Sequence, residues 1–206
     1  MKRLMTTLST WFVITAPGVF SRRQPTRFRM YEPRRWRYQI WRRSVTDLRG
    51  YHLGLGEGKA VWFLDTIMTV KAGGDNTHDA FTLIEFAAPS GFGPPLHIHH
   101  REDECFYVLE GSMRVVCGDD RWEGGPGSFV MLPRGVPHAF VVTSDGPCRG
   151  LQITSPAQFE RFIEELGRPA EALSIPEPSQ PDIDALLGSA ERYGHEYVGP
   201  PLSSGD

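Results

Sequence analysis

Cysteine is scarce in this 206-residue sequence, and no apolar run approaches the roughly 20 residues that span a bilayer. The three cysteines, Cys105, Cys117 and Cys148, are odd in number and do not show the short spacings of a zinc ribbon or a disulfide framework. We interpret them as small buried side chains in a reducing compartment. The sequence therefore predicts a cytoplasmic protein with no membrane contact.

The sequence also lacks a strong net charge, since its total is only -3. Residues 1–50 contain 12 Lys and Arg against 2 Asp and Glu, whereas residues 51–206 contain 10 against 23. Nucleic-acid binding needs a basic face on the folded domain itself. Because the body of this chain is acidic, we expect no nucleic-acid partner.

The N-terminal segment can be interpreted as a secretory signal or as a basic arm outside the folded domain. Residues 4–20 are weakly apolar and follow Met-Lys-Arg, as in a secretory signal, but no clean small-x-small site precedes the arginines. The arginine-rich run that follows contains Trp36 and Trp41 and has no clear period. We expect residues 1–49 to be a disordered basic arm, or a segment upstream of a true start at Val45.

The middle of the chain is typical of a protein with many short strands. Runs rich in Val, Ile, Phe and Thr alternate with turns that contain Gly, Pro and Asp. Strands are predicted at 60–71, 80–88, 96–99, 104–110, 112–117, 128–132, 136–143 and 148–153. About eight strands at this spacing favour an all-β fold, with a jelly-roll barrel over residues 50–155.

After residue 153 the apolar period becomes helical. An apolar stripe over residues 159–166, ended by Gly167, predicts one helix, and a second is predicted near residues 183–192. We expect residues 156–206 to form helices and a tail that pack on the outside of the barrel.

Two histidines and a glutamate form the first half of a metal-binding pattern. His97 and His99 are two residues apart on a predicted strand, so both side chains project from one face. Glu104 lies five residues beyond His99, which is the wrong parity for a continuous strand. We therefore interpret Glu102 and Asp103 as turn residues that reset the register, with Asp103 as the alternative ligand to Glu104.

His138 supplies a fourth donor at the start of a later strand, after a turn fixed by Pro and Gly at residues 133–137. Three imidazoles and a carboxylate suit Fe, Ni, Co or Mn better than Cu or Zn, and a structural zinc site is typically richer in Cys. We expect His97, His99, Glu104 and His138 to bind one divalent transition metal. The remaining histidines carry no metal signal; they are His52, His78, His100 and His195.

Residues 93–111 resemble the first cupin motif and residues 127–138 the second, although Val142 stands where the second motif usually ends in Asn. Over residues 50–172 the chain also resembles the bacterial single-cupin quercetinases, which are flavonol 2,4-dioxygenases. The resemblance implies a metal-dependent dioxygenase that opens a flavonol or a related aromatic enolate with O2 and releases carbon monoxide. In that chemistry, Glu104 would be both a metal ligand and the proton acceptor.

A substrate pocket is predicted on the inward faces of the strands. Phe106, Val108, Phe140 and Val142 share the faces of the metal ligands, and Phe92 is placed at the mouth, which suits a small aromatic substrate. Two alternatives stay open: an isomerase or lyase that does not use O2, and a cupin that only binds a small ligand. A DNA-binding regulator is disfavoured, because the first 50 residues lack an amphipathic helix pair. We also expect a homodimer, since pairing would cover exposed sheet edges.

Overall fold

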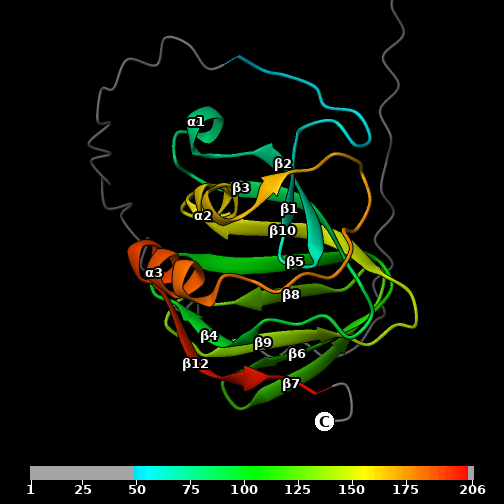
Figure 1. Cartoon of the computed structure of the whole chain (residues 1–206), viewed down its shortest axis with the longest axis vertical. Coiled ribbons are helices and arrows are strands. Elements are labelled where there is room, and N and C mark those ends of the chain that lie inside the picture. The colour runs from blue at the N-terminus through cyan, green and yellow to red at the C-terminus, as the bar shows by residue number, and fades with distance from the viewer. Residues whose placement is uncertain (1–48, 204–206) are drawn as a thin grey trace, which may run out of the picture. The chain divides into compact units, whose positions relative to one another are not determined.

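A computed structural model describes residues 49–203, so the interpretations of the N-terminal arm lie outside the described residues. The seven-stranded antiparallel sheet contains, in spatial order, β11 (Arg168–Pro169), β1 (Lys59–Phe63), β2 (Thr66–Ala72), β3 (Thr82–Ala88), β10 (Cys148–Ser155), β5 (Asp103–Glu110) and β8 (Phe129–Leu132). The five-stranded sheet contains β12 (His195–Pro201), β4 (Pro95–His99), β9 (His138–Val142), β6 (Met113–Cys117) and β7 (Asp120–Gly124). Figure 1 shows β3, β10, β5 and β8 above β4, β9, β6 and β7. The predicted all-β jelly-roll fold is confirmed.

The strand pattern of the sequence corresponds closely to the structure in the middle of the chain and differs at its edges. The single strand predicted over residues 60–71 is a hairpin, β1 and β2, that turns near Leu64 with a φ of 51°. Strands β7 and β12 were not predicted, and the predicted turn after Ala72 contains a short helix, α1 (Gly74–Thr77).

Strand β5 shows how the alternation of side chains builds the core. Glu104, Phe106 and Val108 are buried, whereas Tyr107 and Leu109 are 41% and 50% exposed. This is the parity expected from a register reset before Glu104. The inward residues of β5 meet those of the five-stranded sheet, so Phe106 packs against Phe140 of β9 with ring centroids 5.2 Å apart.

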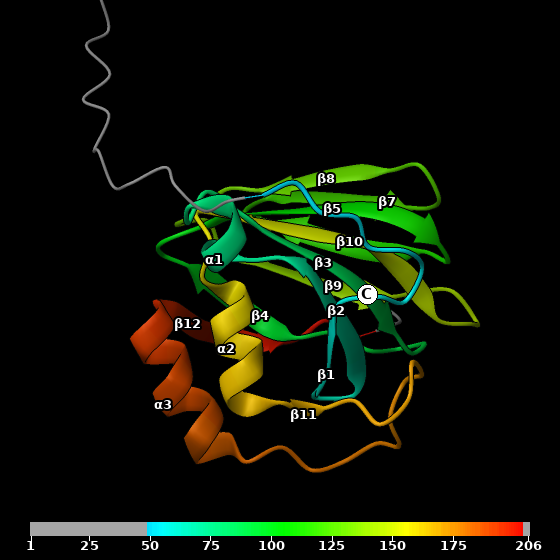
Figure 2. The same ribbon diagram turned by 90° about the horizontal axis from the view of Figure 1, so that it is seen from above.

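Two helices lie next to each other at one end of the strands, as Figure 2 shows. These are α2 (Phe159–Leu166) and α3 (Ile183–Tyr193), and both were predicted within one or two residues. Phe162 and Ile163 of α2 and Leu186 of α3 belong to the hydrophobic core. The helices therefore contribute side chains to the interior of the barrel, in addition to packing on its outside as predicted. Within residues 49–203, no helix is long and apolar enough to cross a membrane.

The segment that follows the last predicted barrel strand adds one more strand to the barrel. After α3, Gly194 adopts a left-handed φ of 75° and ends the helix, and β12 then pairs with β4 at the edge of the five-stranded sheet. Residues 156–203 therefore contribute a strand to the same sheet that carries the three predicted histidine ligands.

Candidate metal centre

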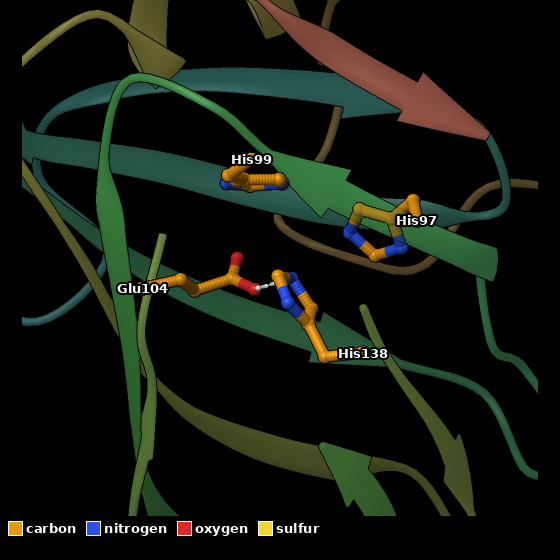
Figure 3. Close-up of side chains that lie close together, drawn as sticks. All are labelled: His97, His99, Glu104 and His138. Carbon is orange, nitrogen blue, oxygen red and sulfur yellow. Dashed lines mark ion pairs between the residues drawn. The ribbon is translucent and has the colours of Figure 1, made fainter. Parts of the chain in front are cut away.

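Four predicted ligands converge from both sheets. His97 and His99 come from β4, His138 begins the neighbouring strand β9 directly opposite His97, and Glu104 comes from β5 in the other sheet. One donor atom from each lies within 4.8 Å of the others. Figure 3 shows the three imidazoles and the Glu104 carboxylate grouped around a common point. The geometry thus provides a three-histidine, one-carboxylate set that could hold a metal ion.

Two of the imidazoles are fixed by the backbone of their own strand. The Nδ1 of His97 donates to the Pro95 carbonyl at 2.8 Å, and the Nδ1 of His138 donates to the Val136 carbonyl at 2.9 Å. Each Nε2 is then the unprotonated nitrogen and is free to bind an ion. The Nε2 of His138 is buried, lies 3.4 Å from Glu104 Oε2 and has no hydrogen-bond partner among the described residues. A bound cation would satisfy both atoms, so the residues fit a metal.

The four side chains are buried, and their ionisation follows from that burial and from one another. Burial lowers the pKa of His97 to about 3, and the neighbouring His99 and His138 lower it further. Burial alone would raise the pKa of Glu104, but the charges of His99, His138 and His97 outweigh it and bring the pKa to about 2. At neutral pH the site therefore holds an ionised carboxylate and a neutral His97, the forms that bind metals.

Gln152 of β10 holds the Glu104 carboxylate, a role that was not predicted from the sequence. Its side-chain amide donates to Glu104 Oε1 from the neighbouring strand, while Oε2 lies toward His138. Gln152 is 3% exposed, so this contact is shielded from water. Only its inward position on β10 could have indicated such a partner.

Glu102 lies in the connection between β4 and β5, as expected of a turn residue, whereas Asp103 is already the first residue of β5, and the burial of Glu102 was not predicted. Its side chain is fully buried, with Oε1 2.9 Å from His195 Nε2 and 3.3 Å from His99 Nδ1. Asp103, the alternative ligand, points away and accepts hydrogen bonds from Arg134, which lower the pKa of the Asp103 carboxyl. The chain therefore directs Glu104, and not Asp103, toward the histidines.

The histidines without a predicted metal role divide into two groups. His52 and His78 are exposed, and His100 is exposed with its Nε2 2.7 Å from Glu196. His195 differs from the expectation, because it is 5% exposed and stacks on His99 with ring centroids 4.2 Å apart. The sequence contained no signal for it, since the strand that carries His195 was itself not predicted.

A cavity of about 80 Å³ adjoins the cluster and is lined mainly by apolar side chains. Three of the five predicted substrate-binding residues, Phe92, Phe106 and Phe140, lie on its wall. Val108 and Val142 do not, and both are buried in the core instead. The physical reason is distance, because Val108 and Val142 lie four residues along their strands from Glu104 and His138, which is roughly 13 Å in an extended chain.

The C-terminal region supplies walls of this cavity that the sequence did not predict. Phe159 and Phe162 come from α2, Leu186 comes from α3, and His195 and Tyr197 come from β12. Burial raises the pKa of Tyr197 to about 12, so its hydroxyl stays protonated at neutral pH. Apart from the clustered ligands His97, His99 and Glu104, Tyr197 is one of few polar groups on the wall.

Comparison with known proteins agrees with this geometry. Residues 84–154 match the cupin domain family, and 151 residues are 29% identical to a quercetin 2,3-dioxygenase of Bacillus subtilis. That match covers 73% of this chain but only 44% of the relative's length. Among solved structures, KdgF of Halomonas sp. is 18% identical with a TM-score of 0.42, over 47% of this chain and 85% of that one. A predicted oxalate decarboxylase of Thermotoga maritima is also 18% identical with a TM-score of 0.42, over 44% and 80%. Residues 84–154 thus match the cupin domain family, and the chain is similar to a quercetin dioxygenase over 151 residues.

Proposed function

We propose that the protein is a metal-dependent dioxygenase that cleaves a flavonol or a related aromatic enolate with O2. The observation that carries this proposal is the buried three-histidine, one-glutamate cluster on the wall of an aromatic cavity. The similarity to a quercetin dioxygenase supports the same class of reaction. We propose iron, nickel, cobalt or manganese as the ion, since these metals accept mixed imidazole and carboxylate ligands.

A divalent ion held by His97, His99, Glu104 and His138 would supply Lewis acidity toward a substrate hydroxyl and a site for O2. Glu104 is the residue we assign as proton acceptor, because its carboxylate is ionised and faces the cavity. Its Oε1 accepts a hydrogen bond from the Gln152 amide and its Oε2 faces His138, so Glu104 would take the hydroxyl proton on Oε2 when that oxygen loosens its hold on the ion. Removing that proton converts the substrate to its electron-rich enolate, which is the form that reacts with O2.

The aromatic residues would orient a flat ring system at the site. Phe106 lies edge-on to Phe86 and to Phe140, with centroid distances of 5.7 and 5.2 Å, and Phe92 lies 6.3 Å from Phe140. These apolar faces would exclude water, and few polar side chains on the wall would compete with the metal centre for the oxygen atoms of the substrate. Tyr197 also lines the cavity, and its protonated hydroxyl could donate a hydrogen bond to a substrate oxygen.

The size of the cavity is the specific observation that favours a second candidate. A volume of about 80 Å³ is well below the roughly 300–1,000 Å³ typical of pockets for drug-sized ligands. It favours compact enolates over a three-ring flavonol, unless side chains such as Leu186 move. It also fits a metal-dependent isomerase or lyase, or a binding protein, for a small substrate.

Oxygen uptake distinguishes these candidates. The protein is loaded separately with each of the four metals and mixed with a size series of aromatic enols, from one-ring compounds to flavonols, in an oxygen electrode. The dioxygenase proposal expects substrate-dependent O2 consumption, loss of that consumption in Glu104→Gln, and no turnover under anaerobic conditions. Turnover without O2 would establish the isomerase or lyase, and no uptake with any metal and any enol would contradict the dioxygenase.

We also propose that the protein forms a homodimer through an outer patch of the seven-stranded sheet, formed by Tyr107, Leu109, Phe129 and Met131. These side chains are 41%, 50%, 62% and 43% exposed, and β8 is an edge strand of the sheet. Phe129 and Tyr107 alone leave about 200 Å² uncovered, a quarter of the roughly 800 Å² that each partner buries in a standard interface. A second copy with the same patch would cover the edge and the apolar surface together.

Light scattering across a dilution series tests this interface. The wild type is expected to be a dimer, and Phe129→Glu is expected to be a monomer. Trp122→Glu provides the control, because Trp122 is 45% exposed on β7 of the other sheet. A monomeric wild type, or a dimeric Phe129→Glu, would overturn the assignment.

A further inference from the structure

The three imidazoles of the candidate metal centre are not held in the same way. His97 and His138 each donate their Nδ1 hydrogen to a carbonyl two residues earlier in the chain, at 2.8 and 2.9 Å. His99 lacks such a contact, and its Nδ1 instead faces Glu102 Oε1 at 3.3 Å. One of the three ligands therefore depends on a side chain for its orientation.

Glu102 is itself held by a residue from the far end of the sequence. It accepts a hydrogen bond from His195 Nε2 at 2.9 Å, and its side chain and that of His195 are 0% and 3% exposed. A carboxylate can only accept hydrogen bonds, so His195 Nε2 must carry hydrogen. His99 Nδ1 lies 3.3 Å from the same oxygen and has no hydrogen-bond partner among the described residues, and the neighbouring carboxylate favours a hydrogen on that nitrogen. With Nδ1 protonated, His99 is left with Nε2 as its metal-binding atom.

Strand β12 fixes His195 in place. His195 pairs with His99 in the register of β12 and β4, and the amide of His100 donates to the Gly194 carbonyl at 2.8 Å. The side chain of Arg101 donates to the Arg192 carbonyl, also at 2.8 Å. The imidazoles of His195 and His99 stack with centroids 4.2 Å apart and an interplanar angle of 21°. His99 is therefore restrained on its face by His195 and at its edge by Glu102.

We propose that Glu102 and His195 are positioning residues of the metal centre: the pair holds His99 in the tautomer and orientation that direct Nε2 to the ion. The inference rests on the proposed metal site but not on the substrate or on the use of O2. It makes the C-terminal strand part of the centre, so a chain that ends before residue 195 would bind the ion weakly.

The test measures metal affinity by competition with a chromophoric chelator, using Co²⁺, whose visible spectrum also reports the ligand geometry. Glu102→Gln is expected to bind Co²⁺ about 10–100-fold more weakly than the wild type and to shift its spectrum. His195→Phe, which keeps a stacking ring but loses the donor, is expected to weaken binding similarly. His195→Gln, which restores an N–H donor, is expected to recover most of the affinity.

A matched control exists on the outer face of the same two strands. His100 and Glu196 form an exposed pair at 2.7 Å, one residue away from His99 and His195. His100→Ala and Glu196→Gln should bind Co²⁺ with wild-type affinity. The far-ultraviolet circular dichroism of each variant verifies folding. Should Glu102→Gln fail to fold, His195→Phe carries the test, because it leaves the carboxylate in place and removes only the donor.

The outcomes separate the two proposals. A wild type that binds no Co²⁺ would contradict the metal site itself. A wild type that binds one ion, with Glu102→Gln and His195→Phe unchanged in affinity and spectrum, would overturn the positioning role alone. Two ions per chain would also overturn it, because His99, Glu102 and His195 lie within 4.8 Å of one another and would then be ligands of a second site.

Discussion

The metal-free protein should lose stability as the pH falls from 6.5 to 4.5, because His97 stays neutral in the fold. Its pKa is lowered from 6.5 to about 3, mainly by burial. Below pH 6.5 the His97 imidazole is therefore protonated in the unfolded chain but not in the folded chain. The stability that is present above pH 6.5 is lost progressively as the pH falls below 6.5. The loss continues until the pH reaches the folded pKa.

The magnitude follows from proton linkage. One proton taken up on unfolding changes the free energy of unfolding by about 1.4 kcal/mol per pH unit. The unfolded imidazole is only half protonated at pH 6.5, so the change between pH 6.5 and 4.5 amounts to about 2 kcal/mol. Three other groups with shifted pKa values, Glu104, Glu102 and His99, change the free energy of unfolding mainly outside the range from pH 6.5 to 4.5. Glu104 and Glu102 have lowered pKa values and act below 4.5, whereas His99 has a raised pKa and acts above 6.5. His195 also has a lowered pKa and adds to the loss in the same direction.

Urea denaturation at a series of pH values, with a chelator present, measures this dependence. The wild-type stability should fall by about 2 kcal/mol more than that of His97→Asn over the window. His78→Asn is the control, because His78 is exposed and its left-handed φ of 55° suits asparagine, so it should follow the wild type. Equal slopes in His97→Asn and the wild type would refute the reasoning.

Three further predictions concern packing and metal removal. Phe106→Ala should lower the free energy of unfolding by about 3–5 kcal/mol in urea, since this 2% exposed ring contacts two others; a loss under about 1 kcal/mol would contradict that packing. Gly93→Ala should lower the thermal midpoint by several degrees, because its Cβ would lie 2.1 Å from the Phe140 carbonyl oxygen. Gly125→Ala is the control and should leave the midpoint unchanged, because open space surrounds that position. Equal midpoints for the two variants would contradict the close approach of Gly93 to the Phe140 carbonyl. Adding a chelator to the metal-loaded protein should lower its calorimetric midpoint, since a ligand at a thousand times its Kd contributes about 4 kcal/mol, and an unchanged midpoint would argue against a bound ion.

The central strands were predictable because each is short, apolar on alternate positions and bounded by turn residues. The alternation on β5 placed Glu104, Phe106 and Val108 inward, as the structure shows. The hairpin at Leu64 was missed because Asp65 is a single turn-favouring residue inside an otherwise apolar and β-branched run, with no Gly or Pro beside it. Strand β7 was missed because four of its five residues are exposed and polar or aromatic, and β12 because it contains glycine and two prolines.

The four clustered ligands could be predicted from spacing, since strand parity and turns act locally. Their supports could not, because these come from distant segments. Gln152 is 48 residues from Glu104, and His195 is 93 residues from Glu102. The burial of Glu102 was not predicted because a glutamate is almost never fully buried without a partner, and its partner His195 lies on a strand that the sequence did not predict.

The most direct test of the metal centre is the ion content of purified protein after loading and dialysis, measured by plasma mass spectrometry in the wild type and in His97→Ala and His138→Ala. The buried donor set predicts one transition-metal ion per wild-type chain and loss of that ion in both variants. Full occupancy in both variants would contradict the assignment of the ligands.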